Sequence, residues 1–266
     1  MDKNKDISCV AIIPARYASS RFPGKPLAML NRKPIIQHVY ERVAQAANDV
    51  YVAVDDERVA NCVSGFGGKY IMTSPSHHSG TDRIAEAYTL IGKHFDVVVN
   101  VQGDEPFIHP DQITALVNCF AKDNTTEIAT VVKPMSEADG EAALLNVNTP
   151  KVVVSKSKKA LYFSRSVIPF IRGKKQDDWL ASHTFYKHIG IYAFRPDILA
   201  AITRLPQGEL EKAESLEQLR WLENDYSISV VESYANTVGI DTPADLKRAE
   251  DFLKEIDLEK SKFSRS

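Results

Sequence analysis

The segment "AIIPARYASSRFPGKP", residues 11–26, joins a short apolar run to a loop that is rich in cations. The apolar run ends at Ala15, and the loop then carries Arg16, Arg21 and Lys25 together with small hydroxyl residues and a glycine. A short continuous apolar run bounded by turn residues is typical of a buried strand. In an open parallel sheet, ligands bind beyond the carboxyl ends of the strands. The sequence therefore predicts an anion site, such as a phosphate site, in this loop.

The loop lacks the residues of two widespread phosphate-binding motifs. Lys25 is followed by Pro26, whereas a P-loop has Ser or Thr at that position, and Ser19 stands where the P-loop needs glycine. The glycines do not follow the GxGxxG dinucleotide pattern either. Two interpretations stay open at this point: a phosphate site of another kind, or a basic loop that is only solvated.

Strand-like and helix-like segments alternate outward from this loop. Short apolar runs predict strands, and apolar residues spaced by three and four positions predict helices. We expect strands at 8–15, 49–56, 69–73, 96–104 and 127–135, and helices at 33–47, 57–66, 82–95 and 110–123. This alternation requires crossover connections, which give a mostly parallel sheet. We therefore expect residues 1–135 to form a nucleotide-binding α/β part.

The pattern changes between residues 136 and 195. Long strand-like stretches at 151–170 and 185–195 flank a polar, Lys-rich loop at 171–179, to which the sequence assigns no role. Beyond them we expect helices at 196–205, 209–225 and 243–260 and a strand at 226–233. The expected fold class is α/β, with a mostly parallel, doubly wound sheet and a smaller β-rich inserted lobe at 136–195. Residues 196–266 are expected to return to the main domain.

Two acidic residues occupy positions from which a sheet edge could present them to a metal ion. Asp104 follows a Val-rich strand and a glycine in "NVQGDEPFI" (100–108), and Asp241 lies in "VGIDTPADL" (238–246). Magnesium usually takes one or two protein carboxylates and completes its shell with phosphate oxygens and water. The alternative is a simple turn at Asp104 and a helix-capping role for Asp241.

The composition narrows the class of protein. The 33 basic and 35 acidic residues give a net charge of −2, which argues against a broad cationic surface for nucleic acid. The three cysteines sit singly in apolar segments, without zinc-ligand spacing. The polar N-terminus lacks a signal-peptide core, and no apolar run approaches the ~20 residues of a membrane span. We expect a reduced, cytoplasmic protein without nucleic-acid or membrane partners.

Taken in order, seven segments resemble the serial motifs of the 3-deoxy-D-manno-octulosonate (Kdo) cytidylyltransferases. They are "IIPARYASSRFPGKPL", "SGTDRIAEA", "NVQGDEPFI", "LYFSR", "KHIGIYAFR", "LEQLR" and "GIDTPADL", and they run from about residue 8 to 250. The first motif is shared in looser form by many sugar nucleotidyltransferases, whereas the ordered set is specific to this family. The resemblance implies a nucleotidyltransferase fold and a Mg²⁺-dependent enzyme.

The resemblance also implies a reaction and a set of nucleotide-binding residues. Such enzymes couple CTP to Kdo and release pyrophosphate, for lipopolysaccharide synthesis. By this likeness, Lys25, Asp104 and Asp241 are catalytic, and the two aspartates hold Mg²⁺. The residues implied to bind CTP are Arg16, Ser20, Arg21, Lys25, Thr73, Ser79, Gly80, Thr81 and Gln102, with the cytosine pocket formed by "MTSPSHHSGTDR" (72–83).

The implied sugar site draws on more distant segments. The residues expected to contact Kdo are Gln102, Arg165, His188, Tyr192, Glu214 and Gln218. His188 and Tyr192 share a strand face by the two-residue period. Glu214 and Gln218 are four positions apart in the expected helix 209–225, which would put them on one helix face. For His188 and Tyr192 the alternative is a half-buried strand face without a ligand. For Glu214 and Gln218 the alternative is a solvated helix face.

The resemblance leaves three functional alternatives and one question of assembly. The acceptor could be another acidic sugar, either 8-amino-Kdo or a sialic acid. The chain could instead be a nucleotide-binding module without catalysis. The family likeness suggests a homodimer, to which the sequence itself adds nothing.

Overall fold

The computed structural model describes residues 7–18 and 21–263, and it divides them into two compact units that are interleaved along the chain. Unit 1 holds residues 7–8, 95–99 and 114–235. Unit 2 holds residues 9–18, 21–94, 100–113 and 236–263. Ser20, one of the residues implied to bind CTP, lies outside the described residues. The division of the chain at residues 135 and 195 stays a prediction.

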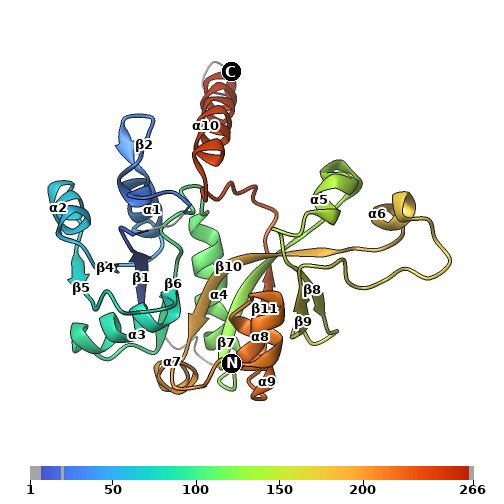
Figure 1. Ribbon diagram of the computed structural model, residues 1–266, viewed down its shortest axis with the longest axis horizontal. Helices are drawn as coiled ribbons and strands as arrows, with labels where there is room; N and C mark the ends of the chain where they lie inside the picture. The colour runs from blue at the N-terminus through green and yellow to red at the C-terminus, as the bar shows by residue number, and fades with distance from the viewer. Residues whose placement is uncertain (1–6, 19–20, 264–266) are drawn as a thin grey trace. The chain divides into compact units, whose positions relative to one another are not determined.

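Unit 2 is built on three parallel strands. Strand β1 (Cys9–Ala15) pairs with β4 (Asp49–Val54), which pairs with β5 (Tyr70–Met72). Crossover helices connect them: α1 (Ile35–Val43) lies between β1 and β4, α2 (Glu57–Gly65) between β4 and β5, and α3 (Gly80–Ile91) follows β5 (Figure 1). The middle of β1 is fully buried, as its apolar sequence predicts.

Shorter elements complete unit 2. A 3-10 turn, η1 (Lys25–Leu27), ends the loop after β1, and the small antiparallel pair β2 (Met29–Leu30) and β3 (Lys33–Pro34) leads into α1. Helix α10 (Pro243–Phe263) is the last element of the chain, and its Phe252 ring meets Phe107 edge-on with ring centroids 4.8 Å apart.

Unit 1 combines parallel and antiparallel strands. Strand β7 (Ile128–Pro134) pairs in parallel with β11 (Ile228–Glu232) and antiparallel with β10 (Tyr186–Phe194). Strands β8 (Lys151–Val154) and β9 (Ala160–Ser164) form a hairpin, and β8 also pairs with β10. Two elements, β6 (Val97–Asn100) and α4 (Pro110–Lys122), have residues in both units. The remaining elements are η2 (Glu137–Asp139), α5 (Glu141–Leu145), η3 (Gln176–Asp178), α6 (Trp179–Ser182), α7 (Pro196–Ile202), α8 (Glu209–Glu214) and α9 (Gln218–Glu223).

The expected fold class is confirmed: the protein is α/β with a mostly parallel sheet. Most expected elements occur within a few residues of their predicted bounds. The expected single helix at 209–225 is wrong, because Ser215 adopts a left-handed conformation (φ 51°) that separates α8 from α9. The two short helices fold back together through a buried ion pair, in which the Arg220 guanidinium donates to both carboxylate oxygens of Glu211 at 2.6 Å. Throughout the described residues, the helices are too short or too polar to cross a membrane.

Candidate active site

In unit 2, the loops that follow β1, β4 and β5 begin at the same edge of the sheet. The strand register places Ala15 opposite Val54, and Val54 opposite Met72, so β1, β4 and β5 end side by side. The loop with the cations follows the first of these strands, and the expected base loop follows the third. Because carboxyl ends of parallel strands share one edge, residues about 40 positions apart in the sequence meet there.

The loop after β1 is closed at its base. Gly24 has a left-handed conformation (φ 70°), which suits glycine, and its N–H donates to the Tyr17 carbonyl at 3.0 Å. The Arg58 guanidinium covers the Tyr17 ring at 3.5 Å from its centroid, and the Tyr17 N–H donates to the Asp55 carboxylate at 3.0 Å. These contacts fix both ends of the described part of the loop. Arg16, Arg21 and Lys25 all line the cavity described below.

Lys25 joins the two acidic residues that the sequence singled out. Its ammonium donates to Asp104 at 2.5 Å and to Asp241 at 3.2 Å, and Arg21 donates to the same Asp241 oxygen at 3.2 Å. Lys25 is the most buried of this group, with 15% of its side chain exposed against 29% for Asp104 and 51% for Asp241. The carboxylates of Asp104 and Asp241 therefore face one point, from which a single cation reaches both.

Backbone contacts explain why residues so far apart in sequence converge. The Ile240 N–H donates to the Asp104 carbonyl at 2.9 Å, which brings the segment before α10 against the segment after β6. Gly103 lets the segment after β6 lie close to β1, since a Cβ at that position would lie 2.8 Å from the Pro14 carbonyl oxygen. Asp241 is held in turn by Asp245, whose carboxylate accepts the Asp241 N–H at 3.0 Å. Thr242 and Asp245 cap α10 reciprocally: the Thr242 hydroxyl accepts the Asp245 N–H at 3.3 Å, and the Asp245 carboxylate accepts the Thr242 N–H at 2.8 Å. The Asp241 carboxylate is left facing Lys25.

A polar cavity of about 300 Å³ opens at this sheet edge of unit 2. Eight of the residues expected at the nucleotide or metal site line it: Arg16, Arg21, Lys25, Ser79, Gly80, Gln102, Asp104 and Asp241. Its wall carries cationic side chains together with two carboxylates, which suits a ligand that carries phosphates together with a metal ion. Thr73 and Thr81 are buried and do not belong to the lining.

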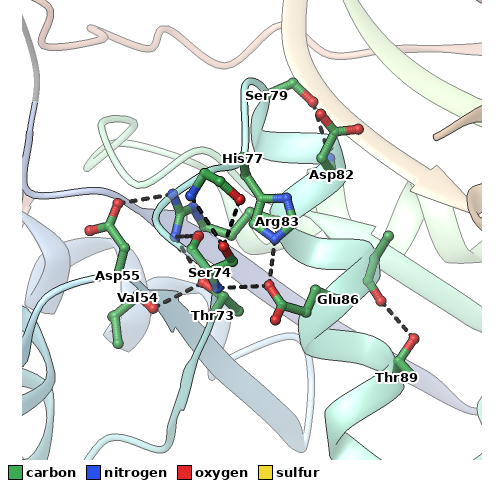
Figure 2. Close-up of polar contacts among 12 residues, drawn as sticks. Val54, Asp55, Thr73, Ser74, His77, Ser79, Asp82, Arg83, Glu86 and Thr89 are labelled. Atoms are coloured by element: carbon green, nitrogen blue, oxygen red, sulfur yellow. Dashed lines mark hydrogen bonds and ion pairs between the residues drawn. The ribbon is translucent and has the colours of Figure 1, made fainter. Parts of the chain in front are cut away.

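The base loop, residues 73–79, is held by side chains from α3 (Figure 2). Arg83 donates to the Thr73 hydroxyl at 2.8 Å and to the Asp55 carboxylate at 2.9 Å. The Thr73 hydroxyl also donates to the Val54 carbonyl, so its hydrogen-bonding capacity is largely used within the protein. One turn further along α3, the Glu86 carboxylate accepts the Ser74 N–H and contacts the His77 ring. Burial acts to raise the pKa of Glu86, but these bonds outweigh it and leave the pKa lowered.

Sequence reasoning missed Asp55 and Glu86. Asp55 directly follows β4, and Asp104 lies in the loop after β6, so a carboxylate beyond a strand end was a usable signal. Glu86 lies within a regular helical pattern, and nothing local marks it. Ser79 caps α3 by accepting the Asp82 N–H at 3.0 Å, a role that its place before a helix predicts.

In unit 1, Arg165 and Glu214 contact each other. The Glu214 carboxylate accepts the Ser164 hydroxyl at 2.6 Å and the Arg165 N–H at 2.9 Å. The Arg165 guanidinium donates to the carbonyls of Glu214, Val147 and Ser215 at 2.6–3.1 Å. Three of its five N–H groups are thus engaged, which leaves two for a ligand. Because the chain turns at Ser215, Glu214 and Gln218 lie on different helices, and the expectation of one shared helix face is wrong.

His188 and Tyr192 lie together on β10 of unit 1, and Gln218 lies at the start of α9 in the same unit. The His188 and Tyr192 ring centroids are 5.3 Å apart, although β10 has a register shift between Ile189 and Tyr192. The His188 ring bonds the Thr130 hydroxyl at 3.0 Å, and burial lowers the pKa of His188 to about 3. The Tyr192 hydroxyl and the Gln218 amide nitrogen are buried and have no hydrogen-bond partner among the described residues. Buried polar atoms are normally paired, so these two atoms indicate a missing ligand or water.

Together, the parallel unit and its charged cavity are typical of nucleotide-binding transferases. A sequence model of the cytidylyltransferases matches residues 10–229. The 3-deoxy-manno-octulosonate cytidylyltransferase of Bacteroides thetaiotaomicron is 62% identical over 245 residues, covering 92% of this chain and 98% of the relative. That of Phocaeicola vulgatus is 61% identical over 246 residues, covering 92% and 97%.

A solved structure agrees with these relatives. The CMP:2-keto-3-deoxy-manno-octonic acid synthetase complexed with CTP superimposes with a TM-score of 0.83 at 43% identity, covering 93% of this chain and 99% of that one. The chain belongs to the 3-deoxy-manno-octulosonate cytidylyltransferase family. The family resemblance inferred from the ordered motifs is thereby confirmed.

Proposed function

We propose that the protein transfers the cytidylyl group of CTP to 3-deoxy-manno-octulosonate and releases pyrophosphate, which supplies an activated sugar for lipopolysaccharide synthesis. An oxygen–phosphorus bond forms between the anomeric oxygen of the sugar and the α-phosphorus, the bond from the α-phosphorus to the pyrophosphate oxygen breaks, and the hydroxyl proton is released to solvent. The observation that carries the proposal is the convergence of Lys25, Asp104 and Asp241 in a cavity also lined by Arg16 and Arg21.

The cations of the loop after β1 are suited to the triphosphate. Arg16 and Arg21 can each present a planar pair of N–H donors, which matches phosphate oxygens. Lys25 offers a compact charge beside them, close enough to the sheet edge to offset the charge that grows on the leaving pyrophosphate. In phosphoryl-type transfer the protein contributes mainly positioning and electrostatic stabilisation, so these residues account for much of the catalysis we propose.

We further propose that Asp104 and Asp241 hold a Mg²⁺ ion. Their oxygens already converge on one cation, the Lys25 ammonium, and two carboxylates are the number that Mg²⁺ takes when phosphates complete its shell. A bound ion would supply Lewis-acid polarisation of a phosphate oxygen. Lys25 must then exchange its carboxylate partners for phosphate oxygens, a change that the flexible lysine stem allows.

The base loop is a reasonable site for cytosine. Residues 77–80 line the cavity, and the side chains of Thr73 and Arg83 bond each other to hold the loop. Recognition of the exocyclic amine and carbonyl of the base therefore falls to backbone groups and to the side chains that line the cavity. Ser79, Gly80 and Gln102 are the expected residues among these.

The polar cluster of unit 1 supports a sugar-binding role. Kdo presents several hydroxyls, and the Tyr192 hydroxyl and Gln218 amide lack partners in the described part of the chain. His188 is neutral at physiological pH because burial keeps its pKa near 3, so it serves as a hydrogen-bonding group and not as a cation. The two N–H groups of Arg165 that are not engaged by carbonyls are suited to the sugar carboxylate.

The test is an assay of pyrophosphate release with CTP and a panel of acidic sugars, with and without Mg²⁺. We expect turnover with Kdo and Mg²⁺, a CMP-sugar product of matching mass, and no turnover in the presence of a chelator. Turnover with 8-amino-Kdo or a sialic acid but not with Kdo would replace the proposed acceptor. CTP binding without any product would favour a non-catalytic nucleotide-binding module.

We also propose a cytoplasmic homodimer, which the family resemblance suggests. The three cysteines are free thiols, as in a reducing compartment. Unit 1 exposes several large apolar side chains, among them Phe170 at 72% and Leu161 at 60%, which a second copy could cover. Light scattering tests the proposal: a mass of one chain at micromolar concentration would contradict it.

A further inference from the structure

In unit 2, an ion pair joins Asp55, which follows β4, to Arg83 of α3 (Figure 2). The Arg83 guanidinium donates to the Asp55 carboxylate at 2.9 Å, and both side chains are buried, with 3% and 9% exposed. Arg83 also donates to the Thr73 hydroxyl at 2.8 Å and to the Ser74 carbonyl at 3.4 Å. The other Asp55 oxygen accepts the Tyr17 N–H at 3.0 Å. The pair therefore joins the loop after β1 to the base loop.

The chemistry of the pair suits positioning better than stability. Removing two charges from water costs several kcal/mol, and apolar residues of similar volume often stabilise a core as well or better. A guanidinium fork, by contrast, fixes directions, because its N–H groups lie in one plane. Here the fork sets the distance and angle between Asp55, which holds Tyr17, and Thr73, which begins the base loop. Three hydrogen bonds in series therefore join the loop after β1 to the base loop: Tyr17 to Asp55, Asp55 to Arg83, and Arg83 to Thr73.

We propose that Asp55 and Arg83 are positioning residues that couple the phosphate-binding loop to the base loop, and so set the affinity for CTP and the preference for its base. The inference rests on the proposed function, because it assumes that the triphosphate and the base occupy these two loops. Asp55 is not among the residues that line the cavity, so it acts through Tyr17 and Arg83 and not by touching the ligand. Arg83 does line the cavity, and its bonds to Asp55 and Thr73 orient it there.

Two variants separate geometry from charge. Asp55→Asn keeps the size of the side chain, but it replaces one of the two oxygens that accept from Tyr17 and Arg83 by an NH2 group, which donates. Arg83→Lys keeps the charge but loses the fork, so it cannot hold Asp55 and Thr73 together. Glu41→Gln is the control. Glu41 lies on α1 and forms an exposed ion pair with Lys33 of β3, and neither residue lines the cavity.

The experiment measures the dissociation constants of CTP and UTP by calorimetry, together with the KM for the sugar and the thermal unfolding of each variant. We expect Asp55→Asn and Arg83→Lys each to raise the dissociation constant of CTP by about 10- to 100-fold, on the order of the loss that a misplacement of about 1 Å causes. We also expect the ratio of the UTP and CTP dissociation constants to move closer to one in both variants. The KM for the sugar should stay within about twofold of wild type. Glu41→Gln should match the wild type in every measurement.

The outcomes distinguish this inference from the proposed function. Folded variants with wild-type CTP affinity and wild-type CTP-over-UTP preference would overturn the positioning role. If Asp55→Asn does not fold, Arg83→Lys decides; if neither folds, the pair is a folding element and the inference fails. A wild-type protein that binds CTP but makes no CMP-sugar contradicts the proposed reaction, while the binding comparison among variants still tests the coupling.

Discussion

Replacing Lys25 by methionine should separate catalysis from stability more sharply than any other single change at the site. Methionine keeps the length and apolar body of the lysine stem but removes the ammonium that contacts Asp104 and Asp241. If this charge offsets the growing charge on pyrophosphate, its loss acts mainly on the transition state. Removal of one preorganised electrostatic donor typically lowers kcat by about 10²–10³, or ~3–4 kcal/mol of activation free energy.

The expected cost in folding free energy is much smaller. Asp104 and Asp241 keep 29% and 51% of their side chains in contact with water, so solvent screens both ion pairs. Pairs of this exposure contribute at most about 1 kcal/mol. The remaining Asp241 contact with Arg21 is unaffected by the substitution. We therefore expect Lys25→Met to unfold within a few degrees of wild type while turning over at most about 1% as fast.

The assay is initial-rate pyrophosphate release at saturating CTP and sugar, with thermal unfolding measured on the same preparations. Lys33→Met is the matched control: it removes a lysine that bonds the exposed Glu41, outside the residues that line the cavity. It should retain wild-type kcat. A kcat for Lys25→Met within threefold of wild type would refute the leaving-group role, and an equal loss in both variants would show that the effect is not specific to the site.

Three further predictions follow from other parts of the structure. Asp104→Asn should abolish turnover with little change in the unfolding temperature, because its side chain is partly exposed; near-normal rates would remove Asp104 from the metal site. Tyr192→Phe should raise the KM for the sugar by about fivefold, which is the effect of one lost hydrogen bond of ~1 kcal/mol. It should not destabilise the free protein, because the Tyr192 hydroxyl has no hydrogen-bond partner among the described residues. A clear drop in the unfolding temperature would contradict this. The free energy of unfolding should fall as pH drops from about 6.5 toward 3, because unfolding lets His188 take up a proton that its folded pKa of about 3 denies it. Chemical denaturation of His188→Gln should show a weaker pH dependence between 6.5 and 4.5, and an unchanged slope there would be inconsistent with a buried neutral His188.

The sheet was predictable because its signals are local. Buried parallel strands appear as continuous apolar runs, and the loop after β1 could be identified from its cations alone. A shared site for Asp104 and Asp241 was one of the interpretations that their positions left open, and the family resemblance implied it; the structure brings both carboxylates to Lys25. Local sequence does not show the Ile240 N–H bond to the Asp104 carbonyl that produces this meeting, because it joins segments 136 positions apart.

Other features depend on long-range pairing and were not predictable. The apolar and charged residues between 209 and 225 satisfy a helical period throughout, yet the Glu211–Arg220 pair folds the chain back at Ser215. A non-glycine residue in the left-handed region costs about 1–2 kcal/mol, which the packing around that pair offsets. Sequence likewise could not show that Arg165 would donate to three backbone carbonyls, since those acceptors carry no side-chain signature.

The central claim is that Asp104 and Asp241 hold one divalent cation on a nucleotide that lies against the cations of the loop after β1. A crystal structure of the complex with CTP and Mg²⁺ tests it most directly. The account predicts one ion within about 2.1 Å of a carboxylate oxygen from each aspartate, with a phosphate oxygen in its shell and Lys25 moved onto the triphosphate. An ion bound by phosphates alone, with Lys25 still bridging the two aspartates, would contradict it.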